Sequence, residues 1–134
     1  MLETSEMLLR LILSAGLASL LGWEREKVGK PAGLRTNMMV AIGTTLLTLV
    51  SVDALQDGDP SRIAAGIVTG IGFLGAGTIF RAKNHVHGLT TAATVWSVAA
   101  VGIAVGTGYY SAAIASTIMM YAILKIAKLE KKKR

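Results

Sequence analysis

The most constraining feature of this sequence is an uncharged, glycine-rich stretch between Arg62 and Arg81. Eighteen residues, IAAGIVTGIGFLGAGTIF, separate the two arginines, and five of them are glycine. As an α-helix the stretch is roughly 27 Å long, close to the hydrocarbon thickness of a bilayer. Glycine costs about 1 kcal/mol in a water-exposed helix, whereas in a membrane it lets neighbouring backbones approach closely. The stretch therefore predicts a tightly packed transmembrane helix.

The composition is also typical of a membrane protein. Hydrophobic residues make up 52% of the 134 residues and charged residues only 16%, whereas a soluble domain carries about 25% charged residues. The formal net charge is +6. The basic residues lie between apolar runs and at the C-terminus, as membrane flanks do, which argues against nucleic-acid binding. The chain has no cysteine, which excludes disulfides and thiolate chemistry.

Five apolar segments predict an all-α, polytopic transmembrane bundle. We expect helices at about 7–23, 36–53, 63–80, 89–105 and 109–126, in one transmembrane domain over 1–134 without a soluble C-terminal domain. Gly106, Thr107 and Gly108 divide the last long uncharged run into two helices. Arg10 lies near one end of the first helix, and we expect its side chain to reach the membrane surface.

The distribution of charges predicts how the bundle is oriented. Twelve of the 14 lysines and arginines fall in the first and third links between helices and in the C-terminal tail. In a five-helix bundle these regions share one side. Positively charged loops mark the cytoplasmic side of a membrane, so we expect the N-terminus outside and the C-terminus inside.

Three blocks of the sequence, at 22–36, 62–81 and 88–110, resemble the membrane domain of the MgtC/SapB family. The first reads GWEREKVGKPAGLRT and the third GLTTAATVWSVAAVGIAVGTGYY. With the spans around them they cover nearly the whole chain, in family order and spacing. The resemblance implies a multi-pass protein of the bacterial inner membrane, linked to growth at low magnesium and to acid stress. It also implies a regulator of other membrane proteins, the ATP synthase among them.

The best candidates for a functional site are Glu24, Arg25 and Arg35. They lie where the link between the first and second expected helices meets the membrane surface. Unpaired charges at a membrane edge are costly, so we expect an ion pair between Glu24 and Arg35. One interpretation is a charged cleft that binds a partner; the other is a pair that only fixes the helix hairpin. The spacing of these residues alone favours the second interpretation. With the resemblance to the family motif, the two interpretations are nearly equally supported.

The acidic link before Pro60 is the candidate metal site. Magnesium prefers oxygen ligands, and the link offers Asp53, Asp57 and Asp59. Three carboxylates in a solvated loop are more often simply hydrated. We therefore expect no bound cofactor, with Mg²⁺ as the one candidate.

The glycines predict close helix contacts. Gly66 and Gly70 form one small-xxx-small pair, and Gly102 and Gly106 form another. Such a pair packs within one chain or against a partner subunit, and we favour packing within the chain. The full set of expected packing glycines is Gly66, Gly70, Gly72, Gly75, Gly77, Gly102 and Gly106.

Neither catalysis nor ion transport has a clear signature in this sequence. His85 and His87 lack a paired nucleophile. No ionisable residue lies in the middle of an expected helix, where a coupled transporter needs one. We expect a non-enzymatic protein that modulates other membrane proteins under low-magnesium or acid stress. The alternatives are a magnesium or other cation transporter or channel component, and a homo-oligomeric scaffold.

Overall fold

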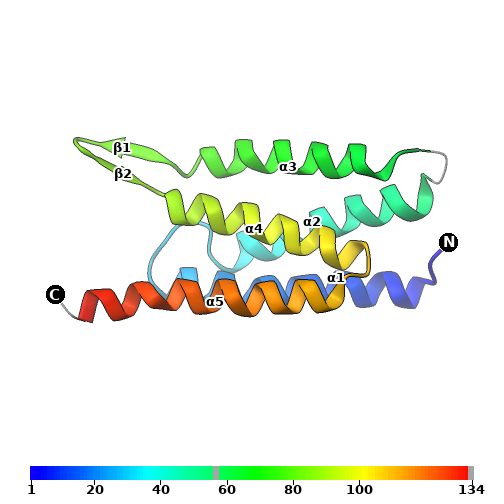
Figure 1. The fold of residues 1–134 in the computed structure, drawn as a ribbon, viewed down its shortest axis with the longest axis horizontal. Helices are drawn as coiled ribbons and strands as arrows, with labels where there is room; N and C mark the ends of the chain where they lie inside the picture. Colours follow the sequence, from blue (N-terminus) through cyan, green and yellow to red (C-terminus); the bar gives the residue numbers. More distant parts are fainter. Residues whose placement is uncertain (56–57, 133–134) are drawn as a thin grey trace.

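A computed structural model of the chain describes residues 1–55 and 58–132, with side chains described through residue 126. Five α-helices form an elongated bundle (Figure 1). They are α1 Thr4–Lys27, α2 Leu34–Leu49, α3 Pro60–Ala76, α4 Leu89–Gly106 and α5 Tyr110–Lys132. A π-helix, η1 (Val50–Ala54), continues α2, and a short hairpin of β1 (Phe80–Ala82) and β2 (His85–His87) joins α3 to α4.

Three helical segments are long and apolar enough to cross a membrane: Thr4–Lys27, Leu34–Ala54 and Leu89–Gly106. The apolar segments Pro60–Ala76 and Tyr110–Ile126 are shorter. Figure 1 shows α3 along one edge of the bundle, α1 and α5 along the opposite edge, and α2 and α4 between them. The mostly helical, membrane-type architecture thus agrees with the sequence prediction.

The prediction for the third helix, 63–80, is wrong at its C-terminal end, and the fold is not purely α-helical. The helix stops at Ala76, within a run of small residues of low helix propensity. The Thr78 hydroxyl donates to the carbonyl oxygen of Gly75 at 2.7 Å, which helps to end the helix. Gly88, at φ 88°, lies so close to the Thr78 backbone that a Cβ there would be 1.8 Å from the Thr78 carbonyl oxygen. This contact folds the following residues back as a hairpin.

The hairpin pairs Phe80 with His87 and Ala82 with His85. The rings of Phe80 and His87 stack, with their centres 5.1 Å apart. Lys83 takes the left-handed conformation (φ 53°) that the tight turn requires. The hairpin therefore projects from one end of the bundle as an ordered element (Figure 1).

A close helix contact joins α2 and α4. A Cβ at Gly102 would lie 1.9 Å from the Thr44 hydroxyl and 2.9 Å from the Ala41 carbonyl oxygen. A Cβ at Gly106 would lie 2.6 Å from the Thr48 Cβ. Thr45 adds a hydrogen bond between the two helices, donating to the Gly102 carbonyl oxygen at 3.1 Å. Gly102 and Gly106 thus pack within the chain.

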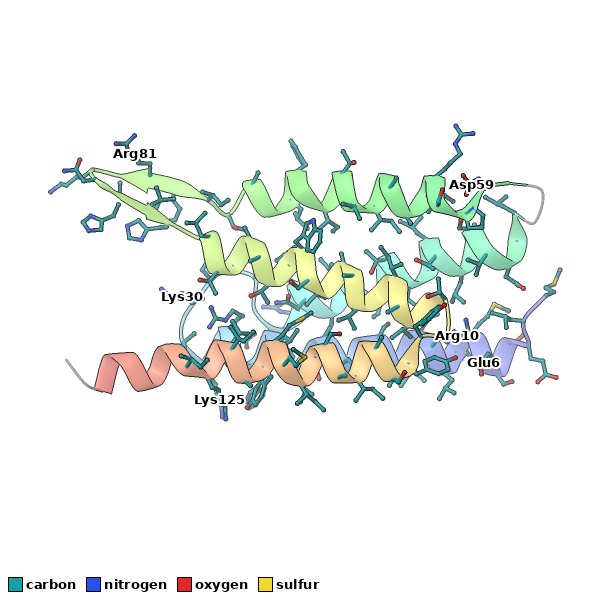
Figure 2. The ribbon with its side chains drawn as sticks, viewed as in Figure 1. Glu6, Arg10, Lys30, Asp59, Arg81 and Lys125 are labelled. Carbon is teal, nitrogen blue, oxygen red and sulfur yellow. The ribbon has the colours of Figure 1, made fainter. Side chains whose placement is uncertain are left out.

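Arg10 holds α1, α4 and α5 together at the N-terminal end of α1. Its Nη1 donates to the carbonyl oxygen of Gly106 at 2.8 Å, and its Nε donates to Glu6 Oε1 at 2.8 Å. The Tyr110 hydroxyl donates to the same carboxylate oxygen. Arg10 is therefore paired and caps the C-terminus of α4, rather than reaching outward as expected (Figure 2).

Much of the surface of α3 is not covered by other helices of the chain. Apart from the backbone of α3 itself, no described atom lies within 4 Å of a Cβ built at Gly66, Gly70 or Gly72. Phe73 on the same helix is 86% exposed. Gly75 is the exception, because a Cβ there would contact the Ala92 carbonyl oxygen of α4 at 3.4 Å. The Gly66/Gly70 pair is thus not used for packing within this chain.

We expect Gly102→Ala to destabilise the bundle by about 3 kcal/mol, because the new methyl group meets backbone that cannot move aside. Gly66→Ala should not destabilise the bundle, since its methyl group enters open space and alanine has the higher helix propensity. Thermal unfolding in detergent, followed by circular dichroism, compares the two variants. Equal unfolding midpoints would contradict the close α2–α4 packing.

Candidate functional site

A cleft of about 780 Å³ opens at one end of the bundle. It is lined by the C-terminal end of α1, the hairpin, the start of α4 and the part of α5 around Leu124. Its lining combines polar and apolar residues. The polar residues are Glu24, Arg25, Lys30, His87, Thr90 and Thr91, and the apolar residues include Phe80, Leu89, Ile123, Leu124 and Ile126.

The floor of this cleft holds a buried ion pair between Glu24 and Arg25, which are 3% and 5% exposed. The Nε and Nη2 atoms of Arg25 lie 2.8 Å and 2.6 Å from the same oxygen, Glu24 Oε2. The second oxygen, Oε1, is buried, and it has no hydrogen-bond partner among the described residues. The pair is neutral overall, but one carboxylate oxygen accepts no hydrogen bond from the described part of the chain.

The expected ion pair between Glu24 and Arg35 is wrong. Glu24 pairs with Arg25 instead, and Arg35 is exposed in the first turn of α2. The reason is the close approach of the two helices: a Cβ at Gly22 would lie 2.8 Å from the Leu34 Cα. Backbone occupies the space between the helices, so Arg35 lies outside it.

Two other side chains fix the α1–α2 hairpin. Glu26 Oε2 accepts a hydrogen bond from the backbone N–H of Leu34 at 2.9 Å, at the start of α2. Asn37, which is fully buried, donates from Nδ2 to the carbonyl oxygens of Ala32 and Gly33 at 2.6 Å and 2.9 Å. Its Oδ1 is the second buried side-chain oxygen without a partner in the described part of the chain.

The acidic candidates do not form a metal site in the described residues. Asp53 Oδ1 accepts from the Leu2 N–H at 2.7 Å and lies 3.4 Å from the N-terminal ammonium group. Asp59 is the N-cap of α3, and hydrogen bonds from Ser61 lower the pKa of its carboxyl group. Asp57 lies outside the described residues. Over residues 1–55 and 58–132, no three His, Cys, Asp or Glu residues gather as a metal site would require.

A second hollow is the apolar groove of about 540 Å³ between α2 and α3. Gly43 on α2 and Gly66 and Gly70 on α3 line it, and Met39 at its edge is 72% exposed. Apart from the backbone of its own helix, no described atom lies within 4 Å of a Cβ built at any of these three glycines. The groove is thus an open surface on which the backbone of another helix can lie.

The structure groups the predicted site residues differently from the sequence. It brings Glu24 and Arg25 together and leaves Arg35, Asp53 and Asp59 apart from them. Sequence reasoning missed Lys30 and the hairpin residues Phe80 and His87, which complete the cleft. The alternation of His85, Val86 and His87 before Gly88 is the signal of a strand that could have revealed the hairpin.

The sequence model of the MgtC family matches residues 11–132. The chain is 41% identical over 131 residues to a protein of Escherichia coli strain K12 named "Putative magnesium transporter YhiD". That match covers 92% of this chain and 61% of YhiD. The chain is also 47% identical over 107 residues to Protein MgtC of Brucella abortus strain 2308, which covers 80% of this chain and 45% of that protein.

An uncharacterized protein of Synechocystis sp. is 48% identical over 119 residues, which is 89% of this chain and 51% of that protein. The chain thus spans about half the length of the curated relatives it matches. No solved structure matches the chain.

We expect Arg25→Met to destabilise the protein by about 3–5 kcal/mol, because it leaves the Glu24 carboxylate buried without its counter-charge. The double variant Glu24→Gln with Arg25→Met should recover most of that loss. Arg35→Met is the matched control and should change stability by less than about 0.5 kcal/mol. Thermal unfolding in detergent measures all three variants, and a single Arg25 variant as stable as the control would show that the pair is not buried.

Proposed function

The chain belongs to the MgtC family, and we propose that it is a non-enzymatic protein of the bacterial inner membrane that modulates other membrane proteins through helix contacts. The proposed setting is growth at low magnesium or under acid stress. Family membership and the apolar helices support a membrane protein connected with magnesium. Regulation through helix contacts requires a surface of the bundle on which a helix of another protein can pack.

The open groove between α2 and α3 is the observation that carries this proposal. Helices in a membrane associate through close packing, and small residues allow the backbones to approach. The groove presents three glycines, Gly43, Gly66 and Gly70, whose faces meet no described atom outside their own helices. The other glycine pair, Gly102 and Gly106, is used inside the bundle. A chain that leaves one such surface unfilled is suited to receive a helix from another protein.

We also propose that the N-terminus faces outside and the C-terminus the cytoplasm. The two termini lie at opposite ends of the bundle (Figure 1). Lys30, Arg81 and Lys125 lie toward the C-terminal end, whereas Glu6, Arg10 and Asp59 lie toward the other end (Figure 2). The positive-inside rule applied to this asymmetry supports the proposed orientation.

The second candidate function is transport of magnesium or another cation. The name given to YhiD favours it, and so does the buried Glu24 oxygen, which has no partner in the described chain and is an acceptor for a cation. Against it, Glu6 and Glu24 lie in the first and last turns of α1, and Asp53 lies in η1 at the end of α2. No described helix therefore carries an acidic side chain at its midpoint, where coupled transporters bind their ions.

Replacing Gly66 and Gly70 by leucine should abolish co-purification of a partner with the tagged protein, because the leucines fill the groove. The unfolding midpoint should not fall, since a Cβ at either glycine meets no described atom outside its own helix. Gly16→Leu is the matched control: it introduces the same side chain at an open position on α1 and should retain the partner. The measurement is mass spectrometry of proteins isolated from membranes of the native host.

A partner retained by the groove variant would contradict the groove as the contact surface. If only a second copy of this chain is recovered, and the variant lowers the mass of the complex in detergent, the protein is a scaffold rather than a regulator.

Purified protein in liposomes should not carry magnesium, as followed with a magnesium-sensitive dye inside the vesicles. Flux above that of empty liposomes, lost in Glu24→Gln, would overturn the regulator proposal in favour of transport. An ionophore control establishes that the vesicles are sealed and that the dye responds.

A further inference from the structure

The carboxylate of Glu24 lacks a donor on one side. Both bonds from Arg25 go to Oε2, while Oε1 is buried and has no partner in the described chain. A buried acceptor without a donor is costly, and more so when it is charged. Glu24 lines the cleft, and the terminal torsion of a glutamate is broad, which allows its carboxylate to turn. The position favours a ligand that brings N–H donors.

The same cleft offers donors for an anion. Lys30 and His87 line it beside Thr90 and Thr91, which belong to the first turn of α4. The N-cap of α4 is Gly88, which makes no side-chain capping hydrogen bond. The first N–H groups of a helix bind phosphate well, and the helix dipole adds to the attraction. The cleft thus offers an acceptor for an ammonium group and donors for a phosphate.

The third part of the cleft suits acyl chains. Phe80, Leu89, Ile123 and Ile126 line it and are exposed. Trp23, an exposed aromatic residue of the type enriched at membrane interfaces, precedes Glu24 at the same end of α1. At this end of α1 the Lys27 ammonium lies 5.0 Å from the centre of the exposed Trp23 ring. A ligand at this level meets lipid on one side and water on the other.

We propose that the cleft binds phosphatidylethanolamine, with the ammonium group on Glu24, the phosphate at Lys30 and the N-terminus of α4, and the acyl chains along the apolar residues of its lining. The volume of about 780 Å³ is in the range of sites for small ligands. Phosphatidylcholine carries a quaternary ammonium group without N–H donors and leaves Glu24 unsatisfied. Phosphatidylglycerol carries no ammonium group. The proposal goes beyond the regulatory function and does not depend on it, because no protein partner takes part.

Native mass spectrometry of the full chain, delipidated and then titrated with lipids of identical acyl chains, tests this. Phosphatidylethanolamine should bind roughly tenfold more tightly than phosphatidylcholine or phosphatidylglycerol, the ratio expected for one charge-assisted hydrogen bond. Glu24→Gln should remove the preference over phosphatidylcholine. Equal binding of the three lipids to the unaltered chain would overturn the proposal.

Lys30→Ala decides the question even if the Glu24 variant does not fold, because Lys30 is exposed. It should weaken binding of phosphatidylethanolamine severalfold. Lys27→Ala, which removes an exposed lysine outside the cleft, should leave binding unchanged. Equal binding by these two variants would contradict the site. Soluble phosphoethanolamine at millimolar concentration should not displace the lipid, and displacement would show that the site takes a free metabolite rather than a lipid.

Discussion

The close approach of α2 and α4 is the contact on which the rest of the structure depends. Gly102 and Gly106 bring the α4 backbone against Thr44 and Thr48, at distances that no larger residue allows. In a bilayer such packing, rather than hydrophobicity, holds helices together. With α2 and α4 locked at the centre, α1 and α5 pack on one side, and α3 lies on the other with most of its glycines unused (Figure 1).

This arrangement gives the bundle two distinct surfaces. At one end, the hairpin closed by Gly88 and the buried Glu24–Arg25 pair form a cleft that is part polar and part apolar. Along one side, α2 and α3 leave a groove whose glycines face outward. The cleft suits a lipid headgroup, and the groove suits a helix. The two proposals are separate because they rest on different residues.

The sequence predicted the five helices well because apolar length and charged flanks are local properties. It failed where contacts distant in sequence decide the structure. The end of α3 depends on Gly88 meeting Thr78, and the role of Arg10 depends on the carbonyl group of Gly106, far along the chain. Neighbouring residues on a helix normally do not face each other, so spacing gave no reason to pair Glu24 with Arg25. Composition could not tell which glycine pair is buried, because that depends on the neighbouring helix.

The most direct test of the account uses a photo-crosslinking amino acid in place of Met39, at the edge of the groove, in cells of the native host. The same residue in place of Ile12, which is 69% exposed on α1, is the control. We expect a discrete adduct with another membrane protein from position 39 and none from position 12. An adduct pattern that is the same at both positions, or the absence of any protein adduct at position 39, would contradict the claim that the groove is the partner-binding surface.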